Sequence, residues 1–402
     1  MRASTRLPPW ARSDVVESIF VAAAKLGGEA RIVGGAVRDW LAKRCVGDID
    51  MAVNLPIRVM ADELRQYQPI KVINTGLDHL TVTVVCGSDA VELTQTRSDD
   101  DTDGRHAVVR FQDDWVQDAA RRDFTINAIY LDAKGQIFDP LNGQADLAAR
   151  RLRFVGAAAD RVQEDALRML RYCRFSIDYS DGHYDGEAMD ALTSFAALSA
   201  RLSGERVAME LRKILMHAAC APAVGLLHKT GLDKASLGCD LLVAGVPFNP
   251  QDLRVVTAHF GWLVLLAAIL PQANATTVLQ RLRLSRAEQK FCGQLAQSNP
   301  AQIFAELSAP NWRQSAFYMD GRAAAYYACA AWRLGEILQP QHYQLLHQWQ
   351  APQLPISGAD LLSHGVDNGP ALGQMIKSAE TLWVQSDFTL TKPALLAAVV
   401  TR

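Results

Sequence analysis

The stretch "RIVGGAVRDWLAKRCVGDID" (Arg31–Asp50) decides how the amino-terminal part of this chain folds. It runs from a short apolar segment through a double glycine into a segment with helical spacing, and it ends on two aspartates. A strand, a glycine turn and a helix in that order predict an α/β unit. The glycines also let a ligand approach backbone N–H groups, and the following helix presents its positive end to an anion.

The two aspartates that end this stretch, Asp48 and Asp50, are a candidate metal site. If "DIDMAV" is a strand, both side chains point to one face, about 6.6 Å apart along the chain. Paired carboxylates suit Mg²⁺, which neutralises phosphate charge. Glu92 on a neighbouring segment is a possible third carboxylate. The alternatives are two solvated turn aspartates and an ordinary surface glutamate.

The composition of the whole chain excludes several classes of protein. The 402 residues are 49% hydrophobic and 21% charged, which indicates a folded rather than a disordered protein. The net charge of −2 leaves nucleic-acid binding open, because basic residues can cluster. Seven cysteines without CxxC spacing argue against a disulfide framework or a zinc site. With no apolar leader and no apolar run of bilayer length, the prediction is a cytoplasmic protein without a membrane partner.

The pattern of apolar residues changes along the chain. Up to about residue 140, β-branched segments such as "LTVTVV" and "AVELTQT" alternate with helical segments, which predicts a small sheet. After "DPLNGQADL" (Asp139–Leu147), apolar residues recur every three or four positions, and prolines separate the segments. The remaining part is therefore predicted to be all-helical.

The segment "RRDFTINAIY" (Arg121–Tyr130) carries a second candidate site. Asp123 and Asn127 are four residues apart, so on a helical turn both could bond a sugar hydroxyl. Arg122, next to Arg121, offers forked donors to phosphate. The alternative is a capped helix with surface arginines.

The segment "EDALRMLRYCRF" (Glu164–Phe175) suggests recognition of a base. On one helix, Asp165, Arg168 and Arg171 form a single stripe. A carboxylate accepts hydrogen bonds and a guanidinium donates them, so the pair matches a base edge with an amino donor beside a ring-nitrogen acceptor. Cytosine and adenine have that order, whereas uracil and guanine do not. The alternative is a set of helical ion pairs, such as Glu164 with Arg168.

Together the motifs resemble one family. "GGAVRD", "DID", "RRDFTINA", "DPLNGQADL", "EDALRMLRYCRF" and "LSGERVAMELRKIL" occur in the order found in class II tRNA nucleotidyltransferases (CCA-adding enzymes) and bacterial poly(A) polymerases. They cover roughly residues 31–215 and are more specific together than singly. Lys43 and Leu80 depart from the pattern, because the family usually has glycine at both places.

The resemblance implies an α+β fold. A small mixed-sheet nucleotidyltransferase head would be followed by an all-α carboxy-terminal half made of neck, body and tail. The implied division is a catalytic head at 1–138, a base-recognising neck at 139–218 and a tRNA-binding body and tail at 219–402.

The resemblance also implies roles for residues. The metal site would be Asp48 and Asp50, which bind the catalytic Mg²⁺, with Glu92 as a weaker candidate. The triphosphate would be held by Gly34, Gly35 and Arg38. The phosphate and ribose would be bound by Arg122, Asp123 and Asn127. The base would pair with Asp165 and Arg168, with Arg171 in support.

The implied activity is template-independent addition of CCA to the 3′ end of tRNA from CTP and ATP, with release of pyrophosphate. The polar segment at 97–119 favours full CCA addition, since members that add only CC are expected to lack a loop there. The nearest alternatives are an A-adding enzyme and a poly(A) polymerase. An alternative of another class is a non-catalytic RNA-binding protein with a decayed site. The sequence leaves the oligomeric state open.

Overall fold

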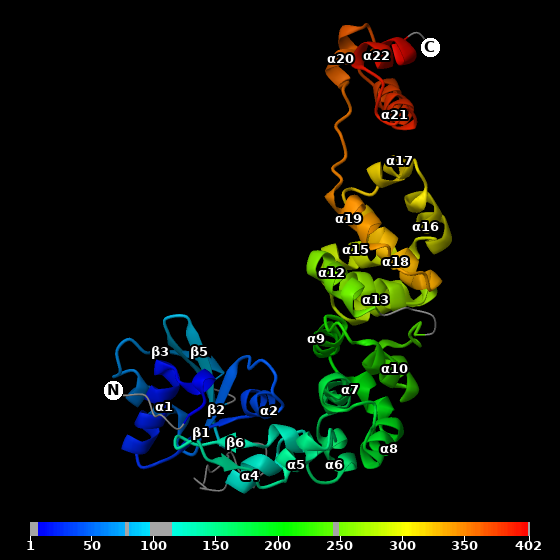
Figure 1. Ribbon diagram of the computed structural model, residues 1–402. Coiled ribbons are helices and arrows are strands. Elements are labelled where there is room, and N and C mark those ends of the chain that lie inside the picture. The colour runs from blue at the N-terminus through cyan, green and yellow to red at the C-terminus, as the bar shows by residue number, and fades with distance from the viewer. Residues whose placement is uncertain (1–6, 77–79, 97–114, 244–248, 401–402) are drawn as a thin grey trace. The chain divides into compact units, whose positions relative to one another are not determined.

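The computed structural model describes residues 7–76, 80–96, 115–243 and 249–400. The chain divides into two compact units, Met1–Ser199 and Ala200–Arg402. The first unit contains a mixed sheet, and the described part of the second is built from helices (Figure 1). The predicted α+β fold with a helical carboxy-terminal half is confirmed. Most of the polar segment at 97–119 lies outside the described residues.

Within the described residues, seven strands form one sheet in the order β3-β4-β5-β2-β1-β6-β7. Strands β2 and β5 run parallel, and the other neighbouring pairs run antiparallel. The strands are β1 (Ala30–Val33), β2 (Ile49–Val53), β3 (Lys71–Gly76), β4 (Thr81–Cys86), β5 (Asp89–Gln95), β6 (Tyr130–Leu131) and β7 (Ile137–Phe138).

The two faces of the sheet have different partners. Helices α1 (Asp14–Lys25) and α3 (Ile57–Leu64) pack on one face, over alternate strand residues such as Ile32, Met51 and Leu93. Residues one position along each strand point to the other face, because the side-chain period is two. On that face α4 (Trp115–Ala120) covers only part of the strands, and the side chains of Asp50 and Glu92 stay exposed.

Helices of the first unit continue beyond the sheet. The bounds of the other α-helices and 3₁₀ turns are α2 (Gly35–Leu41), α5 (Gly143–Ala148), α6 (Ala158–Glu164), α7 (Leu167–Tyr179), α8 (Gly186–Ser194), η1 (Pro9–Ala11), η3 (Thr125–Asn127) and η4 (Ala196–Arg201). The "DPLNGQADL" segment packs α5 closely against η3. A Cβ at Gly143 would lie 2.2 Å from the carbonyl oxygen of Thr125, so the packing requires glycine at this position. The carboxylate of Asp139 accepts the N–H of Gly143 at 2.7 Å.

The second unit is organised around α13, whose residues are all buried. This helix packs against α12, α15 and α18. The elements are α9 (Gly204–Leu215), α10 (Ala221–Lys229), α11 (Leu232–Leu237), α12 (Pro250–Phe260), α13 (Leu263–Ile269), η5 (Gln272–Asn274), α14 (Ala275–Arg281), α15 (Arg286–Gln297), α16 (Pro300–Ser308), α17 (Trp312–Phe317), α18 (Ala323–Leu334), α19 (Pro340–Gln348), α20 (Gly358–Ser363), α21 (Pro370–Gln385) and α22 (Lys392–Val400).

Membrane-spanning potential was assessed on the described helices. None of them is by itself long and apolar enough to cross a bilayer. One pair, Leu263–Ile269 with Gln272–Arg281, passes the length and composition test jointly but is bent by 118°.

Candidate active site

The glycine turn connects β1 to α2. Gly34 has φ +75° and ψ −126°, a combination that a side chain disfavours, and α2 begins at the next residue. A Cβ on Gly34 would lie 3.7 Å from Nη1 of Arg122. The turn therefore lies beside an arginine from a distant segment, as a phosphate-binding turn requires.

Three carboxylates lie next to this turn. Asp50 pairs with Val33 of β1 on one side and with Glu92 of β5 on the other, in parallel register. Asp48 immediately precedes β2. Desolvation, followed by repulsion from Glu92, raises the pKa of Asp50 to about 6, and Asp48 adds to the rise. Asp50 lies on β2 as predicted and has Glu92 beside it, whereas Asp48 lies just before the strand and not on it.

Arg122 is held by a buried carboxylate. Asp118 of α4 is fully buried, and its Oδ2 accepts hydrogen bonds from Nη2 of Arg122 at 3.1 Å and from the Tyr130 hydroxyl at 2.7 Å. Its Oδ1 accepts from Arg121. Burial alone would raise the pKa of Asp118, but the two arginines hold it below its usual range. Arg122 is thereby aimed at the glycine turn, and its charge lowers the pKa of Asp50.

The predicted sugar-binding residues form a connected network. Oδ1 of Asp123 accepts the side-chain amide of Asn127 at 2.9 Å, and Oδ2 accepts Nε of Arg171 at 2.8 Å. Oδ1 of Asn127 in turn accepts Nη1 of Arg38 at 2.6 Å. Burial raises the pKa of Asp123, yet Arg171 and Asn127 more than offset this and keep it low. Arg38 of α2, Asn127 of η3 and Arg171 of α7 thus form one network with Asp123, which lies just before η3.

Arg38 also makes a second set of contacts, with Asp39 and Tyr179. Its Nε donates to Asp39 at 2.9 Å and Nη2 donates to the same carboxylate at 3.1 Å. Asp39 accepts the hydroxyl of Tyr179, two turns beyond Arg171 on α7. The guanidinium lies 4.5 Å from the centre of the Tyr179 ring and is 8% exposed. Arg38 therefore contacts α7 through the Tyr179 ring and through Asp39, whereas its own donors go to Asp39 and Asn127.

The base-recognition segment differs from the prediction of one continuous helix. Helix α6 ends at Glu164, Asp165 is extended with φ −146° and ψ 104°, and α7 begins at Leu167. The cause is local: Oδ1 of Asp165 accepts the N–H of Leu167 at 3.1 Å, a bond that aspartate makes at turns. The prediction that Asp165 shares a helical stripe with Arg168 and Arg171 is wrong.

Arg168 is nevertheless fixed next to the arginine segment. Its Nη2 donates to the carbonyl of Arg121 at 3.2 Å, and Nη1 donates to the carbonyl of Arg161 at 3.1 Å. Nη1 also pairs with Glu164 at 2.6 Å, so the helical ion pair considered as an alternative is present. An ion pair and a base-reading role are compatible, because a guanidinium has five N–H donors.

Sequence reasoning missed the residues that position the site. Asp118 and Tyr130 hold Arg122, whereas Asp39 and Tyr179 hold Arg38. Asp118 lies three and four residues before Arg121 and Arg122, which is the spacing of helical ion pairs. This spacing could have predicted that Asp118 holds the two arginines. The contact of Asp39 with Tyr179 spans 140 residues, and no local pattern indicates it.

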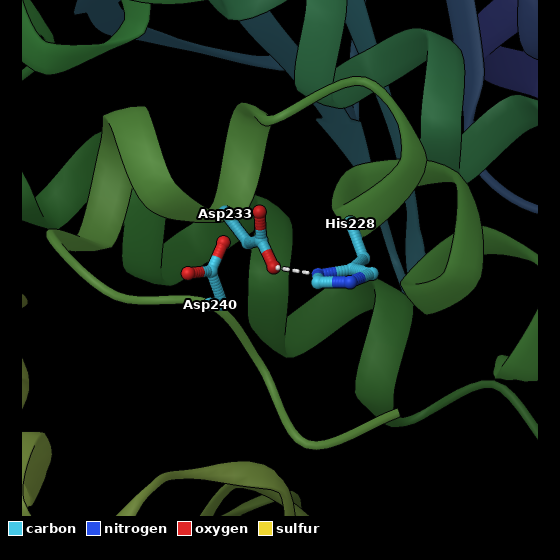
Figure 2. Close-up of side chains that lie close together, drawn as sticks. All are labelled: His228, Asp233 and Asp240. Atoms are coloured by element: carbon cyan, nitrogen blue, oxygen red, sulfur yellow. Dashed lines mark hydrogen bonds and ion pairs between the residues drawn. The ribbon is translucent and has the colours of Figure 1, made fainter. Parts of the chain in front are cut away.

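A group of metal-type side chains also occurs in the second unit. His228, Asp233 and Asp240 place one ligand atom each within 4.8 Å of one another (Figure 2). The buried carboxylate of Asp233 already accepts Nδ1 of His228 at 3.0 Å and the N–H groups of Lys234 and Leu241. These bonds fix the chain around α11, which gives the group a structural role.

Comparisons with known proteins decide the family. Residues 30–153 match the model "Poly A polymerase head domain", and residues 185–237 match "Probable RNA and SrmB- binding site of polymerase A". The mitochondrial CCA tRNA nucleotidyltransferase 1 of Mus musculus is 34% identical over 397 residues, which cover 96% of this chain and 90% of that protein. The chain belongs to the CCA-adding tRNA nucleotidyltransferase family.

Further relatives agree. The CCA-adding enzyme of Geobacillus sp. (strain WCH70) is 41% identical over 208 residues, 51% of this chain and 50% of that protein. The crystal structure of the Bacillus stearothermophilus CCA-adding enzyme in complex with CTP superposes with a TM-score of 0.77 at 26% identity, covering 98% of both chains. The predicted enzyme class is confirmed, and as a nucleotidyltransferase of this family the chain uses a divalent metal ion.

Proposed function

We propose that this chain adds C, C and then A to the 3′ end of tRNA, using CTP and ATP and releasing pyrophosphate, without a nucleic-acid template. The main observation behind the proposal is that two carboxylates lie close to the glycine turn and to Arg122. These carboxylates are Asp50 and Glu92, which pair on neighbouring parallel strands. Similarity to CCA-adding enzymes over nearly the whole chain supports the same activity.

The metal that we propose is Mg²⁺, held by Asp48 and Asp50 with Glu92 beside them. Desolvation, together with repulsion from Glu92 and Asp48, raises the pKa of Asp50 to about 6, and a divalent cation fits such a group because it would relieve the repulsion. Oxygen-only ligands are those that Mg²⁺ prefers. When bound, the ion supplies charge neutralisation and activation of the attacking oxygen.

The protein's own groups then orient the nucleotide. In this proposal the triphosphate contacts the backbone at Gly34 and Gly35 and the guanidinium of Arg122, whose Nη1 lies 3.7 Å from the place of a Cβ on Gly34. The rigid pair Asp123–Asn127 presents polar atoms to phosphate and ribose. Catalysis by such a site consists mostly of positioning and electrostatic stabilisation, since the in-line attack of the RNA 3′-hydroxyl needs little covalent help.

Base choice belongs to Asp165 and Arg168 in this proposal. The break between α6 and α7 leaves Asp165 outside both helices, where its Oδ1 accepts the N–H of Leu167. Arg168 is fixed by two backbone carbonyls. An acceptor beside a donor selects cytosine and adenine over uracil and guanine.

For Arg38 we propose a positioning role in addition to the triphosphate contact that the family resemblance implies. Its Nε, Nη1 and Nη2 atoms all donate within the protein, to Asp39 and Asn127. We assign it to anchoring α2 against η3 and α7, which keeps the glycine turn in place. The proposed division remains a head at 1–138, a neck at 139–218 and a tRNA-binding body and tail at 219–402, and the cytoplasmic compartment stays a prediction.

One experiment tests the activity against its rivals. Transcripts of tRNA that end at the discriminator base, at C and at CC are offered each nucleotide singly with Mg²⁺. We expect CTP incorporation on the first two and a single ATP on the third. Long A tails would indicate a poly(A) polymerase, A addition on the third transcript alone would indicate an A-adding enzyme, and no incorporation would indicate a decayed site. The names of the relatives do not favour these alternatives.

A further inference from the structure

The side-chain amide of Asn127 is held in a single orientation. Its Oδ1 accepts Nη1 of Arg38 at 2.6 Å, and its nitrogen donates to Oδ1 of Asp123 at 2.9 Å. A guanidinium only donates hydrogen bonds and a carboxylate only accepts them, so the flipped amide would place donor against donor and acceptor against acceptor. The direction in which Asn127 presents its second N–H therefore depends on where Arg38 lies.

The position of Arg38 depends in turn on Asp39. Nε and Nη2 of Arg38 donate to the two oxygens of this carboxylate at 2.9 and 3.1 Å. The two residues are adjacent on α2, and side chains one position apart on a helix do not face each other. The side chain of Asp39 is also 19% exposed, so water competes for its oxygens. Helix geometry alone therefore does not keep the carboxylate turned toward the guanidinium.

Tyr179 of α7 supplies a contact from outside α2. Its hydroxyl donates to Oδ1 of Asp39, and the centre of its ring lies 4.5 Å from the guanidinium carbon of Arg38. Phe175, one helical turn earlier, packs on the same guanidinium at 4.9 Å. Burial raises the pKa of the Tyr179 hydroxyl, and the bond to Asp39 adds to the rise against the charge of Arg38. The hydroxyl therefore keeps its proton and can donate.

We propose that Tyr179 is a positioning residue of the nucleotide site, which acts on the ribose contact of Asn127 from a distance. Its hydroxyl holds Asp39, and Asp39 holds Arg38, so the amide keeps one orientation. The inference rests on the function proposed above, in which Asn127 contacts the ribose. An amide fixed in this way presents one N–H to the 2′-hydroxyl, which deoxyribose lacks. The chain should therefore prefer CTP to dCTP, and Tyr179 should contribute to that preference.

The test measures the preference for ribose without catalysis. Radiolabelled CTP is bound to the full chain with Mg²⁺ and without tRNA, and unlabelled CTP or dCTP competes with it in equilibrium dialysis. We expect Tyr179→Phe to lower the ratio of the Kd for dCTP to the Kd for CTP by about fivefold, the scale of one neutral hydrogen bond. Phenylalanine keeps the ring beside Arg38, so the change reports the loss of the hydroxyl.

Tyr172→Phe is the matched control. Tyr172 lies on the same helix and is fully buried, but its hydroxyl accepts the N–H of Asp185 at 3.2 Å, outside the network that contains Arg38. Both substitutions remove one hydroxyl from a buried tyrosine and should lower the melting temperature by similar amounts. Only Tyr179→Phe should change the Kd ratio, whereas a purely structural role of Tyr179 would make the two variants alike.

A second variant tests the path. Asp39→Ala removes the link between Tyr179 and Arg38, so it should lower the Kd ratio at least as much as Tyr179→Phe does. When Tyr179→Phe is added to Asp39→Ala, the ratio should fall no further, because two residues on one path do not act independently.

Four results would overturn the proposal. They are an unchanged Kd ratio in Tyr179→Phe, an equal fall in Tyr172→Phe, a further fivefold fall in the double variant, and equal affinity of the wild-type chain for CTP and dCTP. A wild-type chain that prefers CTP in dialysis but transfers no nucleotide to tRNA would refute the proposed function alone, so the two failures are distinguishable.

Discussion

The carboxylate site and the arginine network lie side by side but are built in opposite ways. Asp50 and Glu92 are exposed neighbours that repel each other, and the pKa of Asp50 rises to about 6. Asp123 is 9% exposed, its oxygens are taken by Arg171 and Asn127, and its pKa falls. Among the described residues, the first site has only Arg122 to offset its carboxylate charge and would gain from the metal ion that we propose, whereas the second is hydrogen-bonded within the folded chain.

This contrast suggests that the carboxylate site serves the reaction, whereas the arginine network holds the residues of the site in position. A site of uncompensated charge contributes little to folding and much to the reaction, because its favourable interactions form only when ligands bind. A saturated network contributes to folding and holds the nucleotide-contacting atoms in place before binding. Substitutions in the two sites should therefore change different observables, and four measurements on three variants, each variant with a control, test how the site is built.

The largest effect should come from Asp50→Asn. Loss of the metal-binding charge removes several kcal/mol of transition-state stabilisation, so the rate of nucleotide transfer should fall by about 1,000-fold. The measurement is single-turnover incorporation of CTP at saturating tRNA. Asp89→Asn, on the same strand as Glu92 but at its exposed start, is the control and should keep the wild-type rate. A rate within tenfold of wild type in Asp50→Asn would place the metal elsewhere.

The next effect concerns the network. Asp123→Asn leaves Arg171 and Asn127 without their shared anion, which should lower the free energy of unfolding by about 3 kcal/mol. Urea titration followed by circular dichroism measures this. Asp181→Asn breaks an exposed pair with Arg150 and should change stability by less than about 1 kcal/mol. Equal changes in the two variants would contradict the view that the network is a folding element.

The third effect is on base choice. Asp165→Ala removes the acceptor and should reduce discrimination of CTP and ATP against UTP and GTP by about 20-fold, as a lost bidentate base contact does. Competition of paired nucleotides on tRNA ending at the discriminator base measures it. Glu164→Ala removes the ion-pair partner of Arg168 and serves as the matched control. Selectivity that is lost in Glu164→Ala and kept in Asp165→Ala would reverse the assignment.

The sequence predicted the local elements of the site better than their mutual positions. "RIVGGAVRD" and "DID" specify strand, turn and strand by short-range rules, and β1, α2 and β2 follow them. The prediction of a single helix over "EDALRMLRYCRF" is wrong because the side chain of Asp165 accepts the N–H of Leu167. The spacing of apolar residues does not indicate this bond.

Tertiary contacts account for most of the remaining differences. Strand β3 was not predicted, and its pairing with β4 is what extends the sheet. Leu80, at a position where the resemblance leads one to expect glycine, adopts a left-handed φ of +57°. The contact of Tyr179 with Asp39 depends on two helices meeting, which no window of sequence contains.

The smallest expected effect is a change in stability when Asp50 loses its charge. It tests the contrast between the two sites most directly, because removal of the carboxylate should stabilise the metal-free chain. Asp50 has a folded-state pKa of about 6 against an ordinary value of 3.8, so its ionised form destabilises the folded chain when metal is absent. That destabilisation is complete above pH 6 and disappears as pH falls toward 4. In EDTA at pH 8, Asp50→Asn should therefore be more stable than wild type by about 1 kcal/mol, a figure reduced for the exposure of the side chain.

Adding Mg²⁺ should reverse this order, because the ion stabilises only the chain that binds it. At pH 4 the two proteins should unfold at the same urea concentration. A wild-type chain that is the more stable one in EDTA at pH 8 would show that the carboxylates are compensated within the protein. The contrast with the Asp123 network would then be lost, since both sites would be complete before any ligand arrives.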